Sequence, residues 1–325
     1  MSIASYTGRD RRPSTRFLLL LLSLLSLSTA CGNYVSYDAE GSTPAAVDIE
    51  QNPVVLDDAP MLTRVNHYAL GGVLATHTSR DEAKGDVFVD YNALASDEEA
   101  LYELERYAAL LASIDPLMLE SAEERFVYFI NAYNVSVIRG VLERFEGDAE
   151  GFKVTESEGF FKDRLYTLGG ETLSLDQIEN LAIRGKFEDE AQTAALEQET
   201  LAALQAWFEA TWPDGKKVDA RLHAALNCGA LGCPNLYATG PYVYQTERLE
   251  EQLEMATTAW LANAEKGAGP DGISMLFTWF EQDFVEDAGS VEAFIEAHRE
   301  GGTSGVDLTD RLEYDWTLNA PENAP

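Results

Sequence analysis

The sequence predicts an α+β fold, a helix-rich single domain in which a buried central helix packs on a small, mostly antiparallel sheet. The chain has 325 residues, enough for one large domain with tails, and 46% of them are hydrophobic, which is ample for a core. Residues 121–146 are apolar nearly all round, as in a buried helix. A Gly169-Gly170 pair between short strand-like runs indicates an antiparallel hairpin.

The first elements follow from local signals. Structure is expected to begin around Val65–Leu74, and residues 86–93 are strand-like near their start. Ser96 is followed directly by three acidic residues, which is typical of a helix N-terminus. The apolar residues after them recur at the spacing of one helix face. Ser121 and Glu124 have capping-box spacing at the start of the central helix.

The remaining elements are predicted in the same way. Residues 166–174 form the Gly-Gly hairpin, and Ser174 with Gln177 begins a helix that continues through Ala182. Residues 188–217 are acidic and helix-prone, and we interpret them as an insertion. The patterns beyond them predict a short buried strand at 222–227, a helix at 246–261, an extended segment at 272–279 and a helix at 290–298.

The N-terminus has the pattern of an export signal. A basic region with four arginines precedes the apolar run 17–27, and small residues stand directly before Cys31. We therefore predict a signal peptide at 1–30, a bacterial lipoprotein-type acylation of Cys31 that anchors the chain in a membrane, and a flexible tether at 31–64. Ser28 and Ala30 also fit ordinary signal cleavage, which would give a soluble secreted protein.

The charge excludes one class of partner. The formal net charge is −33, and removal of the signal, which holds four Arg and one Asp, makes it −36. Such a chain repels nucleic-acid phosphates, so no nucleic acid is expected as a partner. The sequence also has no Gly-rich phosphate loop, no His-Glu-x-x-His and no Gly-x-Ser-x-Gly. We predict no cofactor.

The cysteines allow several readings. If Cys31 is acylated, Cys228 and Cys233 can form a disulfide, which persists outside the cytoplasm. A reactive or redox cysteine is the alternative. A metal site is not predicted, because His223 alone lies near the two thiols.

A catalytic hypothesis makes Cys228 a nucleophile and His223 its base, with Asn134 or Asn227 orienting the imidazole or an oxyanion. The spacing counts against it. On a strand, Arg221, His223 and Asn227 share one face and Cys228 lies on the other; on a helix, His223 aligns with Asn227.

Two further groups of polar residues are candidates for a pocket. Asn131 and Asn134 lie one turn apart on the apolar central helix, where buried amides predict either a structural polar network or the lining of a ligand site. Glu179 and Arg184, five residues apart, are either a solvated charge pair or part of a pocket that contains a general acid or base.

Five ordered blocks of the chain resemble the DUF547 domain family: residues 125–134, 168–179, 221–234, 279–284 and 314–319. The resemblance covers residues 65–319, leaves 320–325 as a tail, and implies a domain often exported in bacteria for which no activity is established. We therefore expect an envelope-associated binding module. The alternative is a cysteine-dependent amide hydrolase or acyl transferase, papain-like or transglutaminase-like, and whether the protein is an enzyme stays open.

Overall fold

The computed structural model describes residues 65–81, 83–237, 239–240 and 242–325. The described residues from Val65 to Pro325 belong to one compact unit. The predicted signal peptide, Cys31 and the tether lie outside the described residues. No helix in the described ranges is long and apolar enough to cross a membrane.

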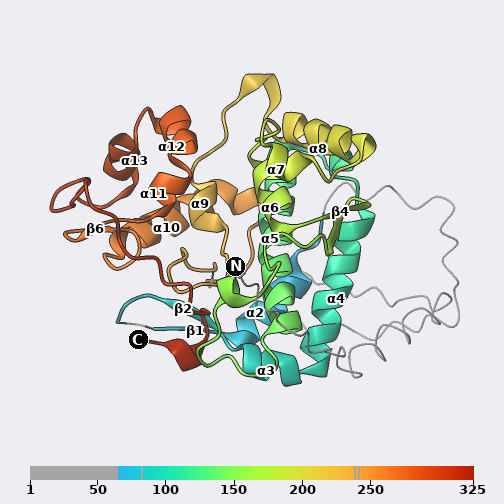
Figure 1. Cartoon of the computed structure of the whole chain (residues 1–325), viewed down its shortest axis with the longest axis horizontal. Coiled ribbons are helices and arrows are strands. Elements are labelled where there is room, and N and C mark those ends of the chain that lie inside the picture. Colours follow the sequence, from blue (N-terminus) through green and yellow to red (C-terminus); the bar gives the residue numbers. More distant parts are fainter. Residues whose placement is uncertain (1–64, 82, 238, 241) are drawn as a thin grey trace, which may run out of the picture. The chain divides into compact units, whose positions relative to one another are not determined.

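Helices dominate this unit, as the sequence predicts (Figure 1). The α-helices are α2 (Tyr68–His77), α3 (Tyr91–Ser96), α4 (Glu98–Ser113), α5 (Ala122–Arg144), α6 (Leu175–Gln177), α7 (Glu190–Thr193), α8 (Gln198–Thr211), α9 (Leu222–Ala225), α10 (Leu249–Ala262), α11 (Leu276–Trp279), α12 (Glu281–Ala288) and α13 (Val291–His298). A π-helical turn, η5 (Ile178–Ile183), continues directly from α6.

Helix α5 is the buried central helix that the sequence predicts. Nearly every residue from Phe126 to Ile138 is buried, and α4, α8 and η5 pack around it. Its N-terminus is capped as expected, because the Ser121 side chain accepts a hydrogen bond from the backbone N–H of Glu124 at 3.0 Å. The Glu124 carboxylate in turn accepts the backbone N–H of Val65 at 3.1 Å, which ties the start of the described chain to this helix.

Within the described ranges the strands form three separate antiparallel hairpins, which agrees with the α+β prediction. They are β1 (Thr78–Arg80) with β2 (Val87–Val89), β3 (Tyr166–Leu168) with β4 (Glu171–Leu173), and β5 (Ala268–Gly269) with β6 (Gly272–Ile273). The predicted Gly-Gly turn joins β3 to β4, and both glycines have positive φ, 55° and 89°. At Gly169 a side chain would collide with Pro116 and Trp207.

The buried side chains of the part of the chain that the structure describes form two hydrophobic cores. The larger is built around α5, and the smaller, around Trp260, Phe277 and Phe284, is formed by α10 to α13. In Figure 1 these later helices gather on one side of α5, while α4 and α8 lie on the other. Helix α9 serves both cores, because Leu222 belongs to the larger and Ala224 to the smaller.

Several local predictions are wrong. Residues 222–225 form helix α9, because two alanines favour a helix and the turn closes when Leu222 N–H bonds to the Asp219 carbonyl. The segment 272–279 is extended for two residues and then becomes α11. Helix α4 forms where predicted, but Asp97 caps it through the backbone N–H groups of Glu99 and Ala100.

The segment 188–217, interpreted as an acidic insertion, contributes to the larger core. Its helix α8 packs on α5 and η5 and buries Leu204 and Trp207, and Trp212 follows at its end. The predicted tail at 320–325 is also bonded to the domain, since the Asn323 side chain accepts from Gly151 N–H and donates to the Ala149 carbonyl.

Candidate functional site

A π-helical turn brings Glu179 and Arg184 together. In η5 the backbone N–H of Arg184 donates to the Glu179 carbonyl at 3.0 Å, a spacing of five residues. On an α-helix residues five apart diverge, whereas a π turn brings them towards one face. The helix begins at a complete capping box between Ser174 and Gln177, as the sequence predicts. Single π turns occur often at functional sites.

Arg184 joins a buried ionic network centred on Asp283 of α12. The Asp283 carboxylate accepts from Arg184 Nε at 2.6 Å, pairs with Lys186 Nζ at 2.9 Å, and lies 3.0 Å from Nε2 of His223. The side chains of Asp283 and His223 are each 1% exposed, so these bonds are shielded from water. The ring of Phe280 stacks on His223 at 4.2 Å between centroids, and the Arg184 guanidinium lies 4.5 Å from the centroid of that ring.

This network sets the charge of its members. Burial alone would raise the pKa of Asp283, but hydrogen bonds from His223 and Arg184 outweigh burial and hold that pKa well below its usual range. Burial lowers the pKa of His223 to about 4. The positive charges of Arg184 and Lys186 also act to lower this pKa, and Asp283 acts to raise it. At neutral pH the site therefore contains an ionised Asp283 and a neutral His223.

Glu179 is the titratable group of the site nearest to neutrality. Burial raises its pKa to about 7, against the opposing effects of Arg184 and of a hydrogen bond from the Tyr133 hydroxyl. The carboxyl group therefore exchanges a proton close to physiological pH. A pocket containing Glu179 and Arg184 stays a prediction, and the two side chains share one largely buried environment rather than forming a solvated surface pair.

The cysteine loop holds two free thiols, and the predicted disulfide between Cys228 and Cys233 is not formed. Hydrogen bonds close the loop instead. Sγ of Cys233 accepts the backbone N–H of Cys228 at 2.9 Å, and Sγ of Cys228 lies 3.1 Å from the hydroxyl of Tyr314. Among the described residues no group of three or more His, Cys, Asp or Glu could hold a metal ion.

The two thiols differ in acidity. Burial raises the pKa of Cys228, and the neighbouring Cys233 raises it further. Burial acts in the same direction on Cys233, but hydrogen bonds from Cys228 and Tyr314 outweigh it and lower the pKa of that thiol. The buried sulfur is thus the more acidic, and the partly exposed one is a weak nucleophile.

The nucleophile–base pair of Cys228 and His223 is not supported. His223 uses Nε2 for Asp283, and its ring lies between Phe280 and Phe284, whereas the thiol of Cys228 contacts Tyr314. Since Asn227 and Cys228 lie beyond the end of α9, the backbone turns away from the imidazole before it reaches the thiol.

The three candidate asparagines hold the backbone. Asn134 donates to the Ala225 carbonyl at 3.0 Å and accepts from Asn227 N–H at 2.9 Å. Asn131 forms the same two-way clamp with the backbone of Tyr244, at 2.9 and 3.1 Å. The Asn227 side chain binds the Pro234 carbonyl and Gly229 N–H within the cysteine loop. These contacts give each amide a structural role, one of the two readings open from the sequence.

Arg221 lies outside the network. It pairs with Asp219 at 2.7 Å, Glu250 at 2.8 Å and Glu254 at 3.5 Å between α9 and α10, where Arg221 itself is partly buried and Glu250 is exposed. Arg221 and His223 are two residues apart, yet the short helix α9 directs them to different partners.

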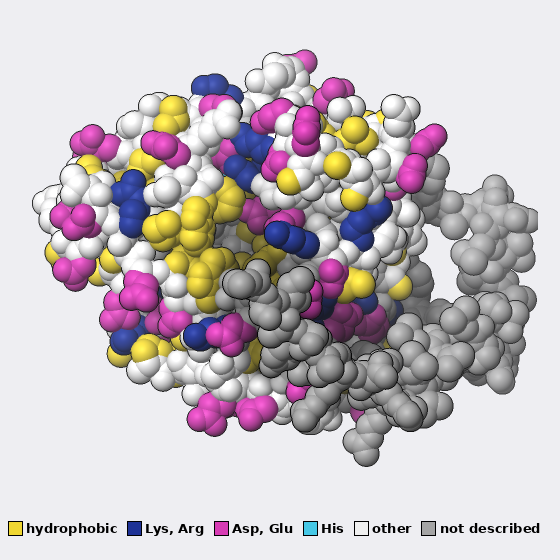
Figure 2. Space-filling model, viewed as in Figure 1, with side chains coloured by type: hydrophobic (Ala, Val, Ile, Leu, Met, Phe, Trp, Pro, Cys, Tyr) yellow, Lys and Arg dark blue, Asp and Glu magenta, His cyan; other side chains and the backbone are white. Residues whose placement is uncertain are grey.

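Sequence reasoning missed Asp283 and a group of aromatic rings. Asp283 lies between Phe280 and Phe284 on one face of its helix, and a carboxylate within an apolar stripe is the signal that could have identified it. We call Trp279, Tyr314 and Trp316 the ring cluster. Their centroids are 4.6 to 5.7 Å apart, and Trp279 remains 42% exposed. Figure 2 shows one face of the molecule, on which hydrophobic side chains gather beside a hollow near the middle.

Residues 118–261 match the family model described as "Protein of unknown function, DUF547". This part of the chain is similar to the DUF547 family. No curated protein and no solved structure matches the chain.

The DUF547 match includes Glu179, Arg184, His223 and both thiols, but it ends before Asp283 and the ring cluster. The carboxylate that completes the ionic network and the exposed rings beside Cys228 therefore come from the C-terminal part of this chain, beyond the matched residues.

Proposed function

We propose that the protein is an exported, lipid-anchored module of the bacterial cell envelope whose DUF547 domain binds an uncharged, sugar-like ligand on the ring cluster. The observation that carries this proposal is the partly exposed set of mutually contacting rings, Trp279, Tyr314 and Trp316. Large aromatic side chains that stay accessible on a folded domain are typical of binding surfaces.

The chemistry around the rings favours a neutral polar ligand. An aromatic face packs against the C–H groups of a sugar ring, while the Tyr314 hydroxyl and the Cys228 thiol offer polar contacts beside it. The acidic chain, with its net charge of −33, disfavours anions. A neutral glycan of the cell envelope meets both conditions.

Binding fits these residues better than cysteine-dependent hydrolysis. The pKa of Cys228 is raised, so this thiol is not a thiolate at neutral pH. His223 is neutral and bonded to Asp283, so it does not activate Cys228. The amide-hydrolase and acyl-transferase alternative, which needs Cys228 as its nucleophile, therefore lacks an activated thiol at that position.

Titration with a soluble N-acetylglucosamine oligosaccharide, followed by tryptophan fluorescence, tests the binding site. Trp279→Ala should weaken binding about tenfold, equivalent to roughly 1.4 kcal/mol, because it removes the most exposed ring. Tyr102→Ala is the matched control, since Tyr102 is 62% exposed and lies on α4. No saturable binding, or equal losses in both variants, would end the proposal for this surface.

Anchoring has its own test. Expressed in a bacterium, Cys31→Ser should move the protein from the membrane fraction to the soluble fraction, because each buried methylene of a lost acyl chain contributes about 0.8 kcal/mol. Retention of the variant in membranes would contradict lipidation at Cys31. A wild-type protein that is already soluble outside the cell would favour ordinary signal cleavage.

A further inference from the structure

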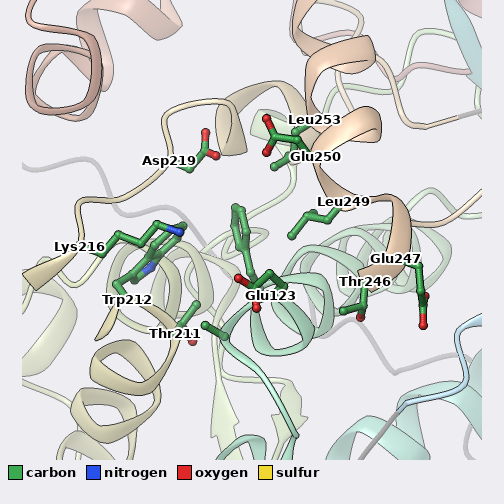
Figure 3. A pocket seen from close by; sticks show the side chains of 12 residues that line it. Glu123, Thr211, Trp212, Lys216, Asp219, Thr246, Glu247, Leu249, Glu250 and Leu253 are labelled. Atoms are coloured by element: carbon green, nitrogen blue, oxygen red, sulfur yellow. The ribbon is translucent and has the colours of Figure 1, made fainter. Parts of the chain in front are cut away.

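A cavity separate from the ionic network lies where three helices meet. It has a volume of about 210 Å³ and is formed by the N-terminus of α5, the C-terminus of α8 and the N-terminus of α10 (Figure 3). Cavities for drug-sized ligands run from about 300 Å³ upwards, so this one suits a smaller molecule.

Apolar side chains form the body of the cavity. Phe126 and Trp212 meet edge to face with centroids 4.8 Å apart, and Leu249 and Leu253 of α10 add to this apolar part, while threonine and charged side chains complete the lining. Trp212 is fixed in place because its indole N–H donates to the Ile183 carbonyl at 2.9 Å. An aliphatic chain can therefore replace water on a preformed surface.

Carboxylates lie on opposite sides of this apolar body. In Figure 3, Glu123 of α5 lies on one side, and Asp219 and Glu250 lie across the cavity from it. Arg221 pairs with Asp219, Glu250 and also Glu254, so one positive charge is shared by three negative ones. The hydrogen bond from Arg221 lowers the pKa of Glu250, which keeps this carboxylate ionised.

The chain itself places a cation on the cavity wall. The ammonium of Lys216 lies 5.9 Å from the centroid of the Trp212 ring, within the range of a cation–π contact. Lys216 is exposed and belongs to the loop after α8, so its ammonium can leave the ring when another cation enters. The Trp212 face thus already accepts an ammonium group.

We propose that this cavity binds a small linear diammonium cation, a molecule with two ammonium groups joined by a short aliphatic chain. The aliphatic part packs on Phe126 and Leu249. One ammonium meets Glu123 and the other meets the carboxylates of Asp219 and Glu250. The separation of negative charge across an apolar body is the complement of this ligand class.

Calorimetric titration of the full-length protein with 1,4-diaminobutane tests the proposal, with butylamine and 1,4-butanediol as comparison ligands. The diamine should bind more tightly than the monoamine, and the diol should give no saturable heat. Glu123→Gln should weaken diamine binding about threefold through loss of a partly solvated charge contact. Lys216→Ala should tighten it by roughly two- to fivefold, because it removes a positive charge on the cavity wall that repels the ligand.

Glu292→Gln is the matched control, since Glu292 is an exposed carboxylate in the first turn of α13 away from the cavity. It should leave diamine binding unchanged. Three results would overturn the proposal: no binding by the wild type, equal affinity for diamine and diol, or equal losses in the Glu123 and Glu292 variants. The last would mean that the overall negative charge attracts the cation without a site. Thermal unfolding of each variant checks that the first-turn substitutions leave the fold intact.

Discussion

Two charge clusters flank the short helix α9, and they differ mainly in burial. One is the network in which His223, Arg184 and Lys186 contact Asp283, whose side chain is 1% exposed. The other is the surface cluster around Arg221, where the partner Glu250 has a side chain 83% exposed. Both place an arginine against carboxylates. Burial determines which one contributes to the stability of the fold.

The physical reason is solvent. In the surface cluster water and ions screen the pairs that Arg221 makes with the exposed Glu250 and Glu254, so these pairs contribute little to stability. In the buried network a charge that loses its partner stays desolvated, and the cost of that state is several kcal/mol. The network also joins the two hydrophobic cores, since Asp283 precedes Phe284 of the smaller core and Arg184 follows Ile183 of the larger.

The largest expected effect comes from removing the central carboxylate. Asp283→Asn should lower the free energy of unfolding by about 3–5 kcal/mol, because Arg184 and Lys186 would remain buried without their anion. Glu250→Gln in the surface cluster should cost under about 1 kcal/mol. Urea denaturation measures both values. Losses of equal size would show that burial does not distinguish the clusters.

The next effect is a pH dependence caused by Glu179. Its pKa rises from 4.5 to about 7 on folding, so the folded state binds this proton more tightly. The resulting stabilisation is complete below about pH 4.5 and is lost as the pH rises through 7. Glu179→Gln removes this dependence, so the stability of the variant relative to wild type should increase by about 3 kcal/mol between pH 4.5 and pH 8.

His223 has the opposite effect on the wild-type curve. Its pKa falls from 6.5 to about 4 on folding, so the unfolded state binds more protons between these values and stability declines as the pH falls through that window. The comparison of Glu179→Gln with wild type cancels this contribution, because both proteins retain His223. Unfolding free energies at pH 4.5, 5.5, 7 and 8 give the difference. A difference that does not change with pH would rule out the raised pKa.

The smallest expected effect is a difference between the two clusters in how their contribution to stability depends on salt. Arg221→Ala should cost about 1 kcal/mol at low ionic strength, and the cost should shrink in 0.5 M NaCl because the surface pairs are screened. The cost of Asp283→Asn should stay nearly constant over the same range. If salt reduces the loss in free energy of unfolding equally for Arg221→Ala and Asp283→Asn, water reaches the buried network.

The elements that the sequence predicted correctly have strong local signals. The hydrophobic pattern of α5, the Gly169-Gly170 turn and the Ser174–Gln177 capping box each depend on contacts within a few residues. The errors occurred where local signals are ambiguous. Leu222–Asn227 is a short apolar run whose pattern fits a strand or a helix. Its first four residues form α9, which two alanines favour and which packs against both cores.

The candidate site shows the same division. The sequence identified Glu179, Arg184 and His223 as candidates, but Asp283, the shared partner of Arg184 and His223, is 60 residues beyond His223. It also suggested that Cys228 and Cys233 are bonded, which is the simplest pairing when three cysteines are counted. In the folded loop the Tyr314 hydroxyl contacts Sγ of Cys228, and the backbone N–H of Cys228 donates to Sγ of Cys233. Only the three-dimensional structure shows these contacts.

The sequence by itself determined the helix-rich α+β class, the buried central helix and the DUF547 resemblance, because periodicity, caps and motifs are properties of short segments. The tertiary structure decided which charges meet. A π turn, the end of α9 and the packing of α12 bring Arg184, His223 and Asp283 to one point, since burial and long-range contacts depend on the whole chain.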